Sequence, residues 1–96
     1  MLFALICTDK PDHLQLRLDT RPAHVDWLSS LGENMKAAGP FLGANGKPTG
    51  SLVIIAADDI EAATVLSAKD PYAIAGLFAS VDIRPWNWVI KNPENA

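Results

Sequence analysis

The run Ser51-Leu52-Val53-Ile54-Ile55-Ala56-Ala57 decides how this chain folds. Aliphatic residues occupy consecutive positions, so the strand that the run predicts is apolar on both faces. Such a strand is typical of a central position in a sheet, where helices or a second subunit cover each face. The flanking segments must therefore supply the neighbouring strands and the covering helices.

Two segments before this run also have the pattern of strands. Residues 1–8 are largely apolar and end where polar residues and a proline begin. Residues 35–42 contain Gly39-Pro40, which suits an edge strand or a bulged one. The glycine-rich stretch 43–50 then predicts a long hairpin loop that leads into the central strand.

Helical spacing of apolar residues predicts one helix over about 12–31 and another over about 59–68. Pro22 interrupts the first pattern, so we expect either a kink there or a second segment that begins with Thr20 as its cap. Asp58 is expected to cap the second helix, because a carboxylate can accept hydrogen bonds from the free amides of the first turn.

The last third of the chain predicts a short helix and a final strand. Asp70-Pro71-Tyr72 begins a turn or short helix that ends at Ala75, and a strand is expected over 77–90. Its apolar residues change parity, which predicts a bulge or bend at Pro85. The polar tail 91–96 is expected to fray.

The order strand, helix, strand, strand, helix, strand predicts an α+β fold, the ferredoxin-like βαββαβ arrangement with an antiparallel sheet. At 96 residues we expect a single domain over 1–96. Helices cover one face of such a sheet and leave the other bare. The two-sided apolar run and three tryptophans predict that a second copy covers this face in a homodimer.

Composition narrows the classes of function. The apolar fraction of 49% against 20% charged residues is that of a globular protein. The net charge of −3 and the absence of a basic cluster indicate that nucleic acid is not a partner, because binding to phosphates requires positive charge. No apolar run is long enough to span a bilayer and no leader pattern is evident, so we expect a cytoplasmic protein without membrane contact. The lone Cys7 and the spacing of the two histidines provide no metal site, and we expect no cofactor.

His24 and Asp70 are the residues that suggest chemistry. His24 lies on the apolar side of its predicted helix with Trp27, Leu28 and Leu31, so its ring should point at the sheet. A carboxylate facing it would fix the tautomer of the imidazole. Each residue also has a structural interpretation: His24 as a half-buried side chain bonded to backbone, and Asp70 as the cap of a turn.

Several stretches of the chain resemble the YCII-related (YciI-like) family in order and separation: Arg21-Pro22-Ala23-His24, Ala38-Gly39-Pro40, Gly50, Asp70-Pro71-Tyr72 and Ile83-Arg84-Pro85-Trp86. The resemblance extends over nearly the whole chain. It implies a ferredoxin-like domain that dimerises into an α/β barrel, with a His-Asp pair in a cleft as the active site. The residues that match this pair are His24 and Asp70.

The resemblance implies little about the substrate, but a few members resemble lyases or dehydrochlorinases that act on cyclic organic compounds, so we expect an enzyme. On this hypothesis His24 is the general acid or base and Asp70 orients its ring. Arg21 would hold an anionic substrate and Tyr72 would donate a hydrogen bond to it, although a solvated arginine and a packing tyrosine are the structural alternatives. A dimeric module that binds or senses a small-molecule ligand without turnover is the second hypothesis, and a purely structural subunit the third.

Overall fold

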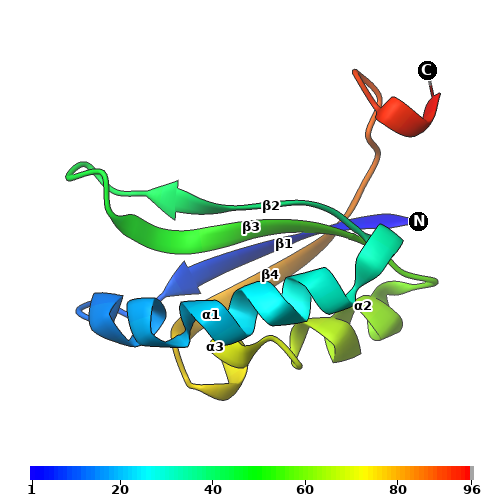
Figure 1. The fold of residues 1–96 in the computed structure, drawn as a ribbon. Coiled ribbons are helices and arrows are strands. Elements are labelled where there is room, and N and C mark those ends of the chain that lie inside the picture. The colour runs from blue at the N-terminus through cyan, green and yellow to red at the C-terminus, as the bar shows by residue number, and fades with distance from the viewer. Residues whose placement is uncertain (96) are drawn as a thin grey trace.

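Four antiparallel strands form one sheet in the computed structural model, which describes residues 1–95 (Figure 1). Their order across the sheet is β2-β3-β1-β4, so β3 lies in the interior, as its apolar sequence predicts. The strands are β1 (Leu2–Asp9), β2 (Met35–Leu42), β3 (Pro48–Ala56) and β4 (Phe78–Trp86).

Three α-helices lie on one face of this sheet (Figure 1). They are α1 (Leu14–Ser30), α2 (Ile60–Ser67) and α3 (Pro71–Ile74). Two single-turn 3-10 helices, η1 (Gly32–Asn34) and η2 (Pro93–Asn95), follow α1 and end the described chain. The α+β, ferredoxin-like architecture expected from the order of elements is confirmed.

The core lies between the sheet and the helices because side chains alternate across each strand. On β1, Leu5 pairs with Val53 of β3, and both are buried on the helix side. The intervening residues Ile6 and Leu52 also pair with each other and face the opposite side of the sheet. The helix-facing cluster comprises Phe3, Leu5, Cys7, Val53, Ile55 and Ala63.

Helix α1 differs from the prediction at Pro22. The helix runs uninterrupted through this residue, so no second segment begins and Thr20 is not a cap. Proline removes one backbone donor from the helix interior, but packing of a long inward face outweighs that local loss. Helix α2 also differs slightly, because Asp59 rather than Asp58 caps it by accepting a hydrogen bond from the amide of Ala62 at 2.8 Å.

The prediction that the last strand reaches residue 90 with a bulge at Pro85 is wrong. Strand β4 ends at Trp86, and Pro85 pairs in register with Phe3. The change in apolar parity marks the point at which the chain leaves the sheet and rises on the side away from the helices (Figure 1). Residues 93–95 of the tail form the single turn η2, and Ala96 lies outside the described residues.

Candidate active site

The structure brings His24 and Asp70 together although 46 positions separate them. His24 comes from the middle of α1, and Asp70 precedes α3, which packs against α1. The distance from His24 Nδ1 to Asp70 Oδ1 is 2.8 Å, and the two residues are only 7% and 3% exposed. Burial limits competition from water, so this contact holds the imidazole in one orientation.

Asp70 is positioned by its own helix. Its side chain caps α3 by accepting a hydrogen bond from the amide of Tyr72 at 3.0 Å, with Pro71 as the first helical residue. The same oxygen, Oδ1, also accepts from His24. The two interpretations of Asp70 are therefore compatible: the cap fixes the carboxylate that faces the histidine.

The face of the His24 ring is also in contact. The Tyr72 ring stacks on it with 3.9 Å between ring centroids and 17° between the planes, and the Trp27 ring lies at 6.1 Å. This packing leaves the imidazole little freedom to rotate. Tyr72 is 1% exposed and supports the histidine ring, so the packing role given as its structural alternative is present, with His24 as a partner that the sequence did not indicate.

The hydrogen bond to Asp70 fixes which nitrogen can react. A carboxylate accepts but does not donate, so the proton of neutral His24 resides on Nδ1 and Nε2 carries the lone pair. Nε2 forms no hydrogen bond with the described residues. Because none of their side-chain nitrogen or oxygen atoms is both buried and without a partner, Nε2 must be reachable by solvent. It is placed to accept a proton from a ligand.

His24 lines a cavity of about 230 Å³ between α1, α3 and the hairpin of β2 and β3. Arg21 and Tyr72, the two candidate substrate-binding residues, line it as well, whereas Asp70 lies behind His24 and does not. The complete lining is Arg17, Leu18, Arg21, His24, Val25, Leu28, Ala38, Gly39, Pro40, Pro48, Ser51, Val53 and Tyr72.

Sequence reasoning missed Arg17, a buried charge in this wall. Its Nε and Nη2 donate to the two carboxylate oxygens of Asp9 at 2.7 and 3.1 Å, and Nη2 also donates to Ser51 Oγ at 2.7 Å. Its guanidinium lies 4.6 Å from the centre of the Tyr72 ring. The signal was present: Arg17 precedes His24 by seven residues, two helical turns on the same face.

Burial sets the protonation of two further groups. Desolvation raises the pKa of Tyr72, although the nearby Arg17 cation acts in the opposite direction, so the phenol stays neutral and can donate a hydrogen bond. Desolvation also raises the pKa of Cys7 to about 12, with the negative charge of Asp70 adding to the effect. Cys7 therefore stays a thiol near neutral pH and is a poor nucleophile.

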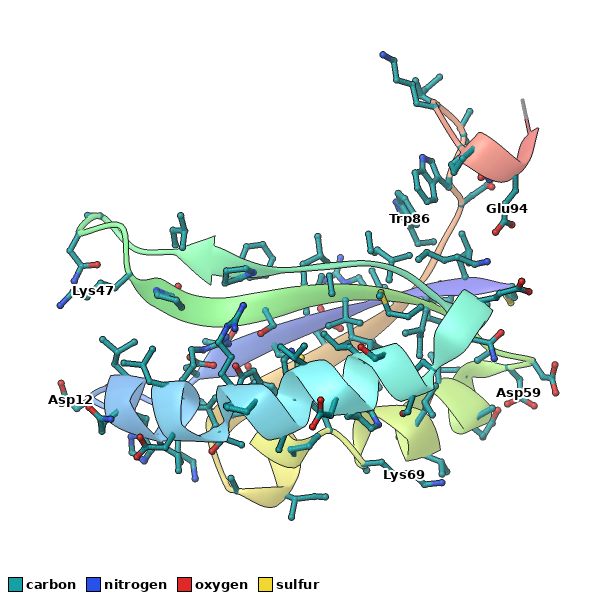
Figure 2. The ribbon with its side chains drawn as sticks, viewed as in Figure 1. Asp12, Lys47, Asp59, Lys69, Trp86 and Glu94 are labelled. Atoms are coloured by element: carbon teal, nitrogen blue, oxygen red, sulfur yellow. The ribbon has the colours of Figure 1, made fainter. Side chains whose placement is uncertain are left out.

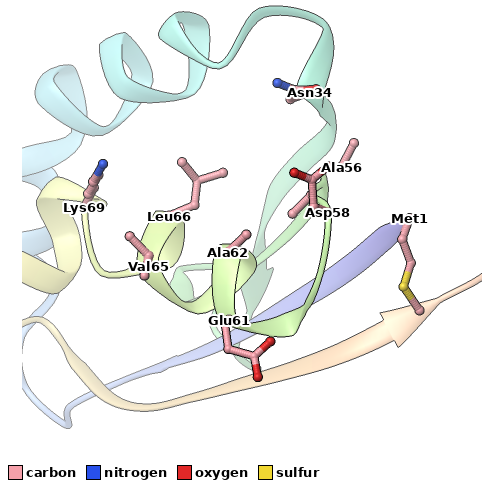
Figure 3. A pocket seen from close by; sticks show the side chains of 10 residues that line it. Met1, Asn34, Ala56, Asp58, Glu61, Ala62, Val65, Leu66 and Lys69 are labelled. Carbon is pink, nitrogen blue, oxygen red and sulfur yellow. The ribbon is translucent and has the colours of Figure 1, made fainter.

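The other openings of the molecule are less suited to chemistry. A hollow of about 610 Å³ lies beside α2, and its labelled polar side chains are spread around the rim rather than converging (Figure 3). Its acidic residues Asp58 and Glu61 are exposed. Across residues 1–95 no group of three His, Cys, Asp or Glu side chains is close enough to hold a metal ion, and no helix in that range is long and apolar enough to cross a membrane.

The fold and this site define a ferredoxin-like α+β protein with a buried histidine-carboxylate pair beside a small cavity. Residues 1–87 match the model of the YCII-related domain, and the chain belongs to this family. It is 34% identical over 97 residues to Protein YciI of Escherichia coli O6:H1, an alignment that covers 93% of this chain and 99% of that protein.

Two solved structures have a similar fold. A 5-chloro-2-hydroxyhydroquinone dehydrochlorinase from Burkholderia phenoliruptrix, in complex with 2,5-dihydroxybenzoquinone, is 34% identical and superposes with a TM-score of 0.85. The match covers 91% of this chain and 94% of that one. An antibiotic biosynthesis monooxygenase, 14% identical with a TM-score of 0.57 over 93% of this chain and 99% of its own, shares the fold alone. A small-molecule enzyme thus exists among the close structural relatives.

Proposed function

We propose that this protein is a cofactor-free acid-base enzyme that acts on a small organic molecule through His24 and Asp70. A lyase or isomerase reaction, such as dehydrochlorination, fits this chemistry. The observation that carries the proposal is the His24 ring, which is bonded to Asp70 through Nδ1, has no partner at Nε2 among the described residues and lines the cavity. The similarity to a dehydrochlorinase that binds a hydroxylated quinone supports it.

In an elimination, His24 acts as the base. A C–H or O–H bond conjugated with the leaving group gives its proton to Nε2, and the freed electron pair forms a new double bond. The C–Cl bond breaks as this double bond forms, and chloride leaves with the electron pair of the C–Cl bond. Asp70 stabilises the imidazolium formed in the first step, which afterwards returns the proton to water.

The cavity favours a ligand with one ring. Pockets for drug-sized compounds measure about 300–1,000 Å³, so about 230 Å³ suits a smaller molecule. Arg21 would attract an anionic substrate, and the neutral Tyr72 hydroxyl would donate to a substrate oxygen. Both of these roles are part of the proposal.

The test is chloride release from 5-chloro-2-hydroxyhydroquinone by the wild type, His24→Gln and Asp70→Asn. Loss of a general base typically costs a factor of about 10²–10⁴, so we expect at least a hundredfold fall in kcat for His24→Gln and a smaller one for Asp70→Asn. His13→Gln is the matched control, because the His13 ring bonds only locally to the carbonyl of Pro11. Undiminished release by His24→Gln would refute the proposal.

The same variants distinguish the second hypothesis, a binding or sensing module. In such a module the wild type binds 2,5-dihydroxybenzoquinone without turnover of any chlorinated analogue, and His24→Gln keeps most of the affinity. A purely structural role for His24 is less well supported, because the side chain lines a cavity instead of closing a dry core.

A further inference from the structure

The hydrogen bonds of Arg17 leave one part of its guanidinium free. The group has five N–H donors. Nε and Nη2 serve Asp9 and Ser51, whereas Nη1 has no partner in the described part of the chain. Since no side-chain nitrogen there is both fully buried and unbonded, Nη1 is reachable by solvent. The space that Arg17 lines is the cavity in front of His24.

This donor pair is held in a fixed position. Arg17 is only 5% exposed, and its Nε and Nη2 atoms donate hydrogen bonds to the two carboxylate oxygens of Asp9. Its guanidinium packs on the face of the Tyr72 ring. The Asp9 side chain, at the end of β1, is only 7% exposed. Burying the two charges of such an ion pair costs desolvation free energy, but two parallel hydrogen bonds hold both side chains in one orientation. A ligand that accepts a hydrogen bond from Nη1 therefore loses little binding free energy to ordering of the Arg17 side chain.

The cavity wall carries an excess of positive charge. Two arginines, Arg17 and Arg21, line it one helical turn apart, and no aspartate or glutamate is among the lining residues. Asp9 balances Arg17, but Arg21 is exposed and makes no ion pair within residues 1–95. The wall thus offers a fixed pair of donors on Arg17 and a second, exposed cation on Arg21 to one negative group.

We propose that Arg17 and Arg21 form an oxyanion subsite beside His24, with Arg17 Nη1 as its fixed donor. The substrate is then a small ring that carries an anionic oxygen, a phenolate or an enolate, next to the proton that His24 removes. This inference rests on the proposed function and names its substrate class. Donors that are already in place bind and orient this anionic oxygen while His24 removes the neighbouring proton.

The test measures binding separately from turnover, by calorimetry with 2,5-dihydroxybenzoquinone, whose acidic hydroxyl groups are ionised at neutral pH. The neutral 2,5-dimethoxybenzoquinone is the matched ligand. Arg17→Lys keeps the charge that faces Asp9 but loses the planar fork. We expect it to weaken binding of the anion at least tenfold and to reduce the preference over the neutral ring, with a smaller loss for Arg21→Gln.

Arg84→Gln is the control variant, because Arg84 is exposed and pairs with Asp82 on the strand β4. Wild-type affinity in Arg17→Lys, no preference of the wild type for the anion, or no binding of either ring would overturn the subsite. Anion binding that depends on Arg17 in a protein that releases no chloride would refute dehydrochlorination as the reaction and retain the subsite.

A second readout needs no change at Arg17. The chain has three arginines, so the Nε–H region of a nitrogen-15 spectrum should contain three side-chain signals, which Arg21→Lys and Arg84→Lys assign by removal. Titration of the wild type with 2,5-dihydroxybenzoquinone should shift the Arg17 signal and leave that of Arg84 in place. An unmoved Arg17 signal at saturation would refute the subsite even if Arg17→Lys does not fold.

Discussion

Protonation of the Cys7 thiol depends strongly on the folded environment. It lies in the core cluster with 2% exposure, and burial raises its pKa from the ordinary 9.0 to about 12. The folded protein therefore holds the thiol proton more tightly than the unfolded chain does. The stability that this provides is complete below pH 9 and is lost as the pH rises toward 12.

We predict that the free energy of unfolding falls with pH above 9 more steeply in the wild type than in Cys7→Ser. The difference in slope should approach 1.4 kcal/mol per pH unit, roughly the value for one proton. Urea unfolding at pH 7, 9 and 10.5 measures it. In native protein at pH 8 the thiol should also resist a disulfide reagent that reacts at once in urea. Equal slopes, or rapid native labelling, would contradict the burial of the thiol.

At the scale of single residues, the histidine and its carboxylate could be found from the sequence, but their support could not. His24 stood out because a titratable ring lay among apolar neighbours at helical spacing. Arg17 has the same phase, yet a lone arginine on a helix usually lies in solvent, and only the approach of Asp9 makes its burial possible. The stacking of Tyr72 on His24 likewise depends on how α3 packs against α1.

Among the elements, β3 contains a position that only glycine can occupy. A Cβ atom at Gly50 would lie 2.3 Å from the carbonyl oxygen of Cys7 on β1, and neither backbone can move without disturbing the pairing of the two strands. We predict that Gly50→Ala destabilises the protein by about 1–3 kcal/mol, measured by chemical unfolding.

Gly39→Ala is the control for this prediction, because no atom of the described residues would lie within 4 Å of a Cβ added at Gly39, its own neighbours in sequence aside. It should change the stability by less than about 0.5 kcal/mol. If both variants unfolded at the same denaturant concentration as the wild type, the close approach of β1 and β3 at Gly50 would be wrong.

The positions of helices and strands were predicted well where the apolar pattern extended over many residues. They were predicted poorly where the end or continuity of an element depended on a single residue. The apolar run of β3 and the helical spacing of α1 indicated type and approximate extent. The continuity of α1 through Pro22 could not be read from proline chemistry, because tertiary packing outweighs a single lost donor. The end of β4 was missed because Trp88 and Ile90 continue the apolar pattern after the chain has left the sheet.

For the molecule as a whole, one face of the sheet, the face opposite the helices, is not covered by any helix of residues 1–95 (Figure 1). The half-buried Leu52 of β3 faces it, together with Phe41 of β2, which is 41% exposed; Ile54 faces the same side but is only 6% exposed. Trp86 and Glu94 belong to the segment that rises on this same side (Figure 2). A face of this kind is typical of sheets that a second copy covers.

We predict that the protein is a homodimer held through this face. Leu52→Lys should convert it to a monomer in sedimentation velocity, because a charge would be buried between the two sheets. Val65→Lys is the control: Val65 is 59% exposed on α2, on the helix side of the molecule. A monomeric wild type, or dissociation caused only by Val65→Lys, would contradict the prediction.

The topology of the whole chain could be predicted from the order of its elements, since few arrangements accommodate that order. The cavity could not, because its volume depends on how far the hairpin of β2 and β3 stands from α1, a distance that no local pattern encodes. The pairing of two copies stays a prediction, because an apolar face indicates that something covers it and not what does.

The central claim is that Asp70 holds His24 with the proton on Nδ1, which leaves Nε2 free to react. The most direct measurement is a long-range proton-nitrogen correlation spectrum of the His24 ring, recorded at a pH where the ring is neutral. We predict a predominantly Nδ1–H tautomer in the wild type and its loss in Asp70→Asn. A proton mainly on Nε2 in the wild type, or a spectrum that Asp70→Asn leaves unchanged, would contradict the account.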